Sequence, residues 1–391
     1  MKKIVLFLLL GLIFLGGLSF AYLLHAKRKE ISSYDRLKDY HYTFHNADIV
    51  NLELKEGKLT LPSNLDEKAT TFLKIKILST FMGNFLPPFV KIKTKDKVAY
   101  DYFEYGGSGW RYINLSSLIK GTDKEIELEA NYLNIADTKV ELITYNNHLK
   151  ADAKILVVSP HPDDAEIAAF GLYSDFPNSF VLTVTSGENG PMDYDELFED
   201  SLSHYLKKGQ IRTINSISVP LFAGLNQDKI LNLGYFDGTL KKMYDKNPSI
   251  VPSQTLKTDE IKTFRQLNVS NLKDSLKGVS NWNSLVQNIQ FILESYKPDI
   301  TVLPHPQMDS HSDHQYTTFA VIQAIKRAQT HSGELFFYSN HHFSTEFFPF
   351  GKAGGTVSLP PNINDEYYFH SIYSHPLSRE KQMEKILALD A

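Results

Sequence analysis

The sequence contains no cysteine among its 391 residues, and this absence excludes several kinds of site. Disulfide scaffolds, zinc sites with cysteine ligands, thiol nucleophiles and redox pairs all require cysteine. Any metal ion in this protein must therefore be bound by histidine, aspartate or glutamate. The chain offers 14 histidines and 45 acidic residues for that purpose.

An excess of charge of either sign is also absent. The 41 Lys and Arg residues nearly balance the 45 Asp and Glu residues, and the formal net charge is −4. Without a basic surplus there is no surface suited to a polyphosphate backbone, so we expect no nucleic-acid partner. Hydrophobic residues make up 42% of the chain, which is ordinary for a globular protein, and the length allows two hydrophobic cores or one core with large additions.

A long uncharged run occurs at the N-terminus, in residues 4–24, with basic residues on both sides of it. At about 1.5 Å per residue this run can cross a hydrocarbon layer of about 30 Å. We therefore expect residues 1–30 to form a membrane anchor with one transmembrane helix, or else a cleaved signal peptide. The catalytic domain is then expected outside the cytoplasm, and secreted if the segment is cleaved.

Residues 31–150 show the alternation of apolar and polar side chains that is typical of half-buried strands. The pattern is present in residues 71–77, 89–93, 125–129 and 140–143, with turn residues between the segments. Short strands at this spacing predict a small β-sandwich-like domain. The aromatic side chains of this region can stack on sugars, or can simply fill a small core.

Residues 151–391 follow a different pattern, in which apolar runs alternate with helical periodicity. Residues 154–159 are predicted to form a buried strand, 164–173 a helix and 179–185 the next strand. A second helix at 282–296, a strand at 299–304 and a helix at 313–327 extend the pattern. The sequence therefore predicts an α/β fold with a mostly parallel, doubly wound (Rossmann-like) sheet and helices on both faces. The polar stretch 240–275 is predicted to be an insertion or flexible loop.

Two of the predicted strands end in clusters of metal-binding residue types. The first strand leads into the sequence His-Pro-Asp-Asp-Ala-Glu at 161–166, and the later strand leads into a run of His and Asp residues at 305–314. Ligands of open parallel sheets bind outside the carboxyl ends of the strands, so both clusters can converge on one ion. A catalytic zinc needs three protein ligands and an open position for water. We expect His161, Asp164 and His314 to be those ligands, with one divalent ion per chain.

The neighbouring residues suit the remaining chemical roles. Asp163 would be left without a metal bond, close to the water that the ion activates, and can act as general base. His311 can donate to the oxyanion that develops on the substrate, and Asp313 can orient one of the imidazoles. Glu166 either supports His161 or is a solvated helix residue. The alternative for the whole first cluster is a helix N-terminus, where Asp side chains cap free N–H groups.

These motifs resemble the PIG-L / LmbE-like deacetylases, a family of zinc-dependent enzymes that remove N-acetyl groups from N-acetylglucosaminyl compounds. The resemblance covers residues 151 to about 330, and Ser312 stands where proline is common in the family. It implies the same metal ligands, general base and oxyanion residue as the reasoning above. It further implies that Glu188, Arg212 and Asp237 contact the sugar, although Asn215 replaces a glutamate that often follows the arginine.

The sequence therefore predicts a membrane-attached, zinc-dependent amidohydrolase that acts on an N-acetylated sugar of a glycan or glycolipid. A metal-dependent phosphoester hydrolase is the alternative enzyme class, and it would call for two metal ions. A glycan-binding membrane protein without catalytic activity is the alternative outside enzymes.

Overall fold

The computed structural model describes residues 2–31, 34–119, 124–193, 195–198, 200–329, 333–342, 348, 354–361 and 367–390. The chain divides into two compact units, Met1–His148 with Phe343–Ser374 and Leu149–His342 with His375–Ala391. The sequence predicted a boundary near residue 150 and assigned everything after it to the catalytic domain. The described residues of the 343–374 segment instead belong to the first unit.

The chain begins with helix α1 (Lys2–Ile31). Among the residues that the structure describes, no helix is both long enough and apolar enough to cross a membrane. The transmembrane helix expected from residues 4–24 is therefore not supported by the structure.

The first unit contains two antiparallel sheets whose inward-facing side chains form one core. Alternation places Leu73, Ile75 and Ile77 of the longest strand in that core, and each of them is fully buried. One sheet has the order β2-β10-β4-β7 with β9 beside β4, and the other has the order β3-β8-β5-β6. The strands are β2 (Asp48–Glu53), β3 (Lys58–Thr60), β4 (Thr70–Ser79), β5 (Phe89–Lys93), β6 (Val98–Tyr102), β7 (Ser108–Asn114), β8 (Glu125–Asn131), β9 (Leu133–Ile135) and β10 (Lys139–Tyr145).

A late segment of the chain adds to this unit. Strand β16 (Tyr367–Phe369) pairs in parallel with β1 (Tyr42–Phe44). The ring of Phe369 stacks on that of Phe44 at a centroid distance of 6.1 Å. These contacts cover a second group of buried aromatic side chains, which includes Tyr112 and Tyr145. Two of the aromatic residues of the β-rich region are thus core residues.

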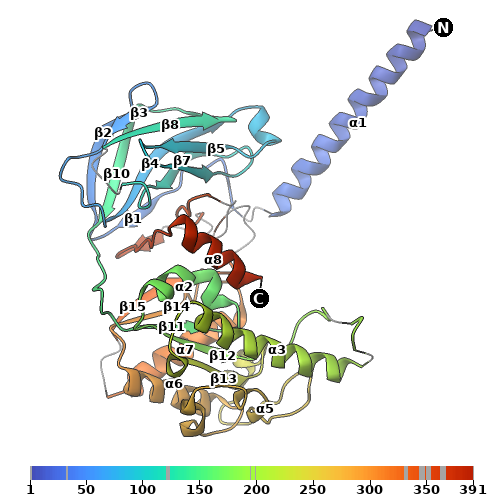
Figure 1. Ribbon diagram of the computed structural model, residues 1–391. Helices are drawn as coiled ribbons and strands as arrows, with labels where there is room; N and C mark the ends of the chain where they lie inside the picture. The colour runs from blue at the N-terminus through green and yellow to red at the C-terminus, as the bar shows by residue number, and fades with distance from the viewer. Residues whose placement is uncertain are drawn as a thin grey trace. The chain divides into compact units, whose positions relative to one another are not determined.

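The second unit is built on a sheet of five parallel strands with the order β13-β12-β11-β14-β15 (Figure 1). Counted from β11, this is the order 3-2-1-4-5 of a doubly wound fold, as predicted. The strands are β11 (Ile155–Ser159), β12 (Phe180–Thr185), β13 (Ile230–Tyr235), β14 (Ile300–Pro304) and β15 (Glu334–Tyr338). The helices are α2 (Asp164–Asp175), α3 (Ser201–Phe222), α4 (Leu240–Asp245), α5 (Lys262–Arg265), α6 (Trp282–Tyr296), α7 (Ser312–Arg327) and α8 (Arg379–Leu389).

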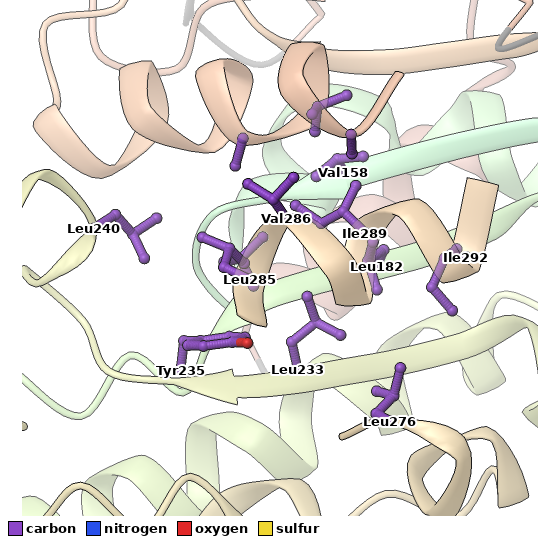
Figure 2. Packing of buried hydrophobic residues seen from close by; sticks show 14 of the residues in the cluster. Val158, Leu182, Leu233, Tyr235, Leu240, Leu276, Leu285, Val286, Ile289 and Ile292 are labelled. Atoms are coloured by element: carbon purple, nitrogen blue, oxygen red, sulfur yellow. The ribbon is translucent and has the colours of Figure 1, made fainter. Parts of the chain in front are cut away.

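Helices cover both faces of this sheet. Helices α6 and α7 lie on one side, and α2 with α8 lies on the other (Figure 1). Val286 and Ile289 of α6 belong to the same hydrophobic cluster as Leu182 and Leu233 of the sheet, and all four side chains are fully buried (Figure 2). Burying each such side chain stabilises the fold by about 1.5–3 kcal/mol, so this layer holds the strand ends in fixed positions.

The polar stretch 240–275, predicted to be an insertion or a flexible loop, contributes to the hydrophobic core and is therefore not a flexible loop. Its apolar residues Leu240, Met243 and Phe264 are completely buried in the main hydrophobic core of the second unit. They are spaced irregularly because the stretch contains only the short helices α4 and α5 and a 3-10 turn at Asn271–Ser275. The segment therefore packs beside the end of β13.

Candidate metal centre

The structure brings the three predicted metal ligands together at the point where the strand order reverses. His161 follows β11, Asp164 opens α2, and His314 lies in the first turn of α7 after β14. His161 Nδ1 lies 3.0 Å from Asp164 Oδ2 and 3.2 Å from His314 Nε2, and Asp164 Oδ2 lies 3.0 Å from His314 Nε2. These three atoms form a nearly equilateral triangle, and all three residues are buried.

This triangle fits a small divalent ion. A tetrahedral zinc with ligand bonds of about 2.0–2.1 Å holds its ligand atoms about 3.3 Å apart, close to the observed separations. Two nitrogen atoms and one carboxylate oxygen are also the donor set of many catalytic zinc sites. The residues present therefore suit one zinc ion with an open position beside it.

The electrostatic environment also favours a positive charge at this point. Burial lowers the pKa of His314, but the carboxylates of Asp164 and Asp309 outweigh it and raise the pKa to about 9. Burial works against the charged form of Asp164, yet the imidazoles of His314 and His161 hold the pKa of this carboxyl well below its usual range. Both shifts come from attraction between imidazoles and carboxylates, so the carboxylates of Asp164 and Asp309 place negative charge beside the imidazole of His314.

Local structure argues against the helix-cap alternative for the first cluster. Asp163 occupies the N-cap position of α2, but its side chain makes no capping hydrogen bond. The Ser159 hydroxyl accepts the Ala165 N–H at 3.2 Å in its place. Asp164 Oδ2 accepts the His161 N–H at 2.9 Å, which draws its carboxylate towards the imidazole. The Asp163 carboxylate is thus not engaged by the helix that it precedes.

Asp163 instead pairs with Arg212. The guanidinium Nη2 donates to Asp163 Oδ1 at 3.0 Å, and the Asp163 side chain is 51% exposed. The loop after β12 approaches this pair closely, because a Cβ on Gly187 would lie 2.5 Å from Arg212 Nε and 2.8 Å from the Pro162 ring. In the structure Arg212 holds the predicted general base, and the sugar contact that the resemblance implies for Arg212 stays a prediction.

The second nitrogen of His161 faces two carboxylates. Asp237 Oδ1 lies 3.3 Å and Asp313 Oδ2 lies 3.6 Å from His161 Nε2, without an aligned hydrogen bond. Carboxylates at this position favour the tautomer that carries its proton on Nε2, which leaves Nδ1 free to bind a metal. Asp313 also accepts the Gly238 N–H at 2.7 Å, so it fixes the turn after β13.

The imidazole of His314 is oriented by Asp309, which the sequence reasoning missed. Asp309 Oδ2 lies 2.9 Å from His314 Nδ1, and its Oδ1 accepts the His311 N–H at 3.0 Å. Asp309 is completely buried. The only signal in the sequence was its place in the same cluster, five residues before His314. The orienting role that we expected of Asp313 thus falls to Asp309 for this imidazole.

His311 lies beside the triangle at the N-cap position of α7. Its ring stands at 90° to that of His161 with the centroids 4.7 Å apart, and its Nδ1 is buried without a hydrogen-bond partner among the described residues. Burial and the neighbouring His161 and His314 lower the pKa of His311. A neutral imidazole with an unpaired buried nitrogen suits interaction with a further group in this crevice.

The carboxylate of Glu188 is hydrogen-bonded to neighbouring groups of the protein at both of its oxygens. It is completely buried, and its Oε2 accepts the Asp237 N–H at 3.0 Å and the Ser186 hydroxyl at 2.8 Å. Its Oε1 accepts the Ser253 hydroxyl at 2.8 Å, and burial raises the pKa of Glu188 to about 7. Glu188 therefore positions the turn that carries Asp237, and the sugar contact that the resemblance implies for it stays a prediction.

Glu166 is buried as well, so the solvated alternative for this residue is wrong. Its Oε1 accepts the hydroxyl hydrogen of Tyr173 at 2.9 Å. Burial raises the pKa of Glu166 to about 8. This carboxyl group thus belongs to the packing of α2.

Two further residues of the site come from the segment after β15, which no motif marked. Asn340 Nδ2 donates to Asp164 Oδ1 at 2.9 Å, and the ring of His341 lies 4.8 Å from that of His314. Three sets of side chains lie close enough together to share an ion. One set is His161 with His311 and His314, another is Asp164 with His314 and His341, and the third is His161 with Asp237 and Asp313. Each group reuses a member of the triangle, so the described residues converge on one centre.

The fold and this centre define a doubly wound α/β domain whose switch point carries a His/Asp group suited to a metal ion. Residues 156–325 match the model of the PIG-L family, described as GlcNAc-PI de-N-acetylase. The resemblance to this family is thereby confirmed for that part of the chain. No curated protein matches the chain.

Solved structures show weaker similarity. An N,N'-diacetylchitobiose deacetylase from Pyrococcus horikoshii is 21% identical over 46% of this chain and 51% of its own, with a TM-score of 0.29. A conserved protein from Thermus thermophilus is 22% identical over 49% of this chain and 68% of its own, with a TM-score of 0.30. The 4-carboxy-2-hydroxymuconate hydratase GalB from Pseudomonas putida is 15% identical over 45% and 57%, with a TM-score of 0.28. This chain thus aligns with about half of the archaeal deacetylase.

Proposed function

We propose that the second unit is a zinc-dependent hydrolase that removes the N-acetyl group from an N-acetylglucosaminyl-type sugar of a glycan or glycolipid. The observation that carries the proposal is the triangle of His161 Nδ1, Asp164 Oδ2 and His314 Nε2 at the switch point of the sheet. The match to a family described as a de-N-acetylase supports the amide of an N-acetyl sugar as the bond that is cleaved.

His161, Asp164 and His314 would hold the ion. When bound, a zinc ion supplies a Lewis acid that polarises the amide carbonyl and makes water a nucleophile near neutral pH. Asp163 takes the proton from the attacking water, because its carboxylate is half exposed at the crevice and forms no capping bond. The same carboxyl then delivers the proton to the amine as the carbon–nitrogen bond breaks.

Arg212 and His311 complete the set of acting residues. The guanidinium of Arg212 binds Asp163 Oδ1 and so fixes the orientation of the carboxylate while its second oxygen remains available. His311 donates a hydrogen bond to the amide carbonyl oxygen, which becomes an oxyanion when water attacks the carbon. Its closeness to His161, with 4.7 Å between the rings, puts this donor beside the predicted ligands.

A phosphoester hydrolase with two metal ions is less well supported. Such sites hold two ions about 3.5–4 Å apart, each with its own ligands. Among the described residues, every donor group that lies close enough to hold an ion shares His161, Asp164 or His314 with the triangle. An independent second ligand set is therefore not formed by these residues.

The proposal is tested by acetate release from N-acetylglucosaminyl oligosaccharides and glycolipids with the full chain and its Asp163→Asn variant. We expect the variant to keep its zinc and to lose about 10²–10⁴-fold in rate, the usual contribution of a general base. Asp245→Asn is the matched control, since Asp245 is 48% exposed and paired with Lys241 on another helix. An Asp163→Asn variant that releases acetate at the rate of the wild type would refute the mechanism.

A further inference from the structure

Asn340 follows β15 and is 2% exposed, although it lies outside both sequence motifs. Its side-chain Nδ2 donates to Asp164 Oδ1 at 2.9 Å and to the Asp164 backbone carbonyl at 3.1 Å. Both neighbours accept hydrogen bonds and neither donates. The amide nitrogen, rather than the amide oxygen, must therefore face Asp164.

The two oxygens of Asp164 have separate partners. Oδ2 belongs to the triangle with His161 Nδ1 and His314 Nε2. Oδ1 is engaged by the Asn340 amide. A carboxylate with both oxygens available can bind an ion through two bonds and so occupy two coordination positions. A hydrogen bond on Oδ1 restrains Asp164 to one bond.

The backbone of the same segment is tied to the other side of the site. The N–H groups of Asn340 and His341 donate to Asp309 Oδ2 at 2.9 Å and 3.1 Å. Asp309 Oδ2 in turn lies 2.9 Å from His314 Nδ1. The backbone of Asn340 is thus held by Asp309, which also contacts His314, while its side chain binds Asp164.

We propose that Asn340 is a positioning residue that makes Asp164 a single-oxygen metal ligand and thereby keeps a coordination position open for water or substrate. The inference rests on the proposed metal site, and it adds the reason why this site stays open at one position. Catalytic zinc sites need such an open position, whereas structural sites are closed by four protein ligands. Loss of partners of this kind typically lowers metal affinity about 10–100-fold.

The test uses the full chain with two variants, Asn340→Asp and Asn340→Ala. Asn340→Asp keeps the shape but replaces the donor by a carboxylate, and Asn340→Ala removes the donor without adding charge. Asn268→Ala is the matched control, because Asn268 is also 2% exposed and its Nδ2 also donates two hydrogen bonds, to the carbonyls of Asn232 and Arg265. This control shows how much of any change in Asn340→Ala comes from losing a buried amide rather than from altering the metal site.

The readouts are zinc affinity, measured by competition with a chelator, and the visible spectrum of the Co²⁺-loaded protein. We expect both Asn340 variants to bind zinc about 10–100-fold more weakly and to show the weaker cobalt absorption of a higher coordination number, while Asn268→Ala keeps the wild-type values. An unchanged cobalt spectrum in folded Asn340→Ala would overturn the inference, whatever the zinc affinity.

The outcome also separates this inference from the proposed function. A wild-type chain that binds zinc, responds to Asn340→Ala as expected and yet releases no acetate would refute the proposed function and support the role of Asn340. A wild-type chain that binds neither zinc nor cobalt would overturn both.

Discussion

Asp309→Asn changes one atom in a buried carboxylate that holds the metal site together. Asp309 receives four donors in the structure: His314 Nδ1 and the N–H groups of Asn340 and His341 at Oδ2, and the N–H of His311 at Oδ1. An amide has only one acceptor atom. In its best orientation the amide oxygen keeps the three donors of Oδ2, and the amide nitrogen then meets the His311 N–H.

The magnitude follows from this geometry. The amide nitrogen and the His311 N–H then face each other as two buried donors without an acceptor, which costs about 1–3 kcal/mol of folding free energy. The loss of negative charge beside His314 Nδ1 makes this imidazole a weaker ligand. For such an orienting group we expect zinc affinity to fall about 10–100-fold, or about 1.4–2.7 kcal/mol.

Zinc affinity is measured by competition with a chromophoric chelator, and stability by denaturant unfolding of the metal-free protein. Asp299→Asn is the control, because Asp299 Oδ2 accepts the Lys154 N–H at 2.9 Å just before β11, at the opposite end of the sheet. We expect that variant to keep the wild-type zinc affinity. An Asp309→Asn variant with unchanged zinc affinity would show that Asp309 does not orient a metal ligand.

Two further predictions concern stability. Burial raises the pKa of Asp101 to about 7 from 3.8, so its neutral form stabilises the first unit fully below about pH 4, and this contribution is lost as the pH rises through about 7. Denaturant unfolding should show the stability of the wild type relative to Asp101→Asn falling between about pH 4 and pH 7, and a constant difference would contradict this. Gly187 has a φ of 64°, so Gly187→Ala should lower the free energy of unfolding by about 1–2 kcal/mol. The added methyl group should also displace Arg212 from Asp163 and so slow acetate release. A variant with the wild-type stability and the wild-type rate would refute the close packing at Gly187.

The sequence was informative where chemistry and topology restrict the choice. That His161, Asp164 and His314 lie together was predictable, because few residue types bind a metal ion without cysteine and because parallel strands end at the same edge of a sheet. Helix α6 was predictable in full, since Leu285, Ile289 and Ile292 recur at helical spacing on one buried face.

Residues that act through other residues were not predictable. Asn340 lies 176 positions from Asp164, and nothing in its neighbourhood distinguishes it from an ordinary turn residue. Asp309 precedes α7, so its contact with His314 depends on the turn between strand and helix and not on a helical repeat. Glu188 matched a family pattern, but the pattern gives no sign that its carboxyl group is buried and accepts the Asp237 N–H.

Burial without regular periodicity was also missed. Leu240, Met243 and Phe264 belong to the main core, yet the stretch that contains them has too little helix to produce a repeating apolar face. The segment 343–374 joined the first unit through β16, and pairing between strands so far apart leaves no local signal.

The central claim is that His161, Asp164 and His314 bind one divalent ion. The most direct test is a crystal structure of the zinc-loaded chain with anomalous diffraction data collected at the zinc absorption edge. We predict one peak in this unit, about 2.0–2.2 Å from His161 Nδ1, Asp164 Oδ2 and His314 Nε2. A zinc peak bound by other atoms, or no peak within reach of these three, would contradict the account.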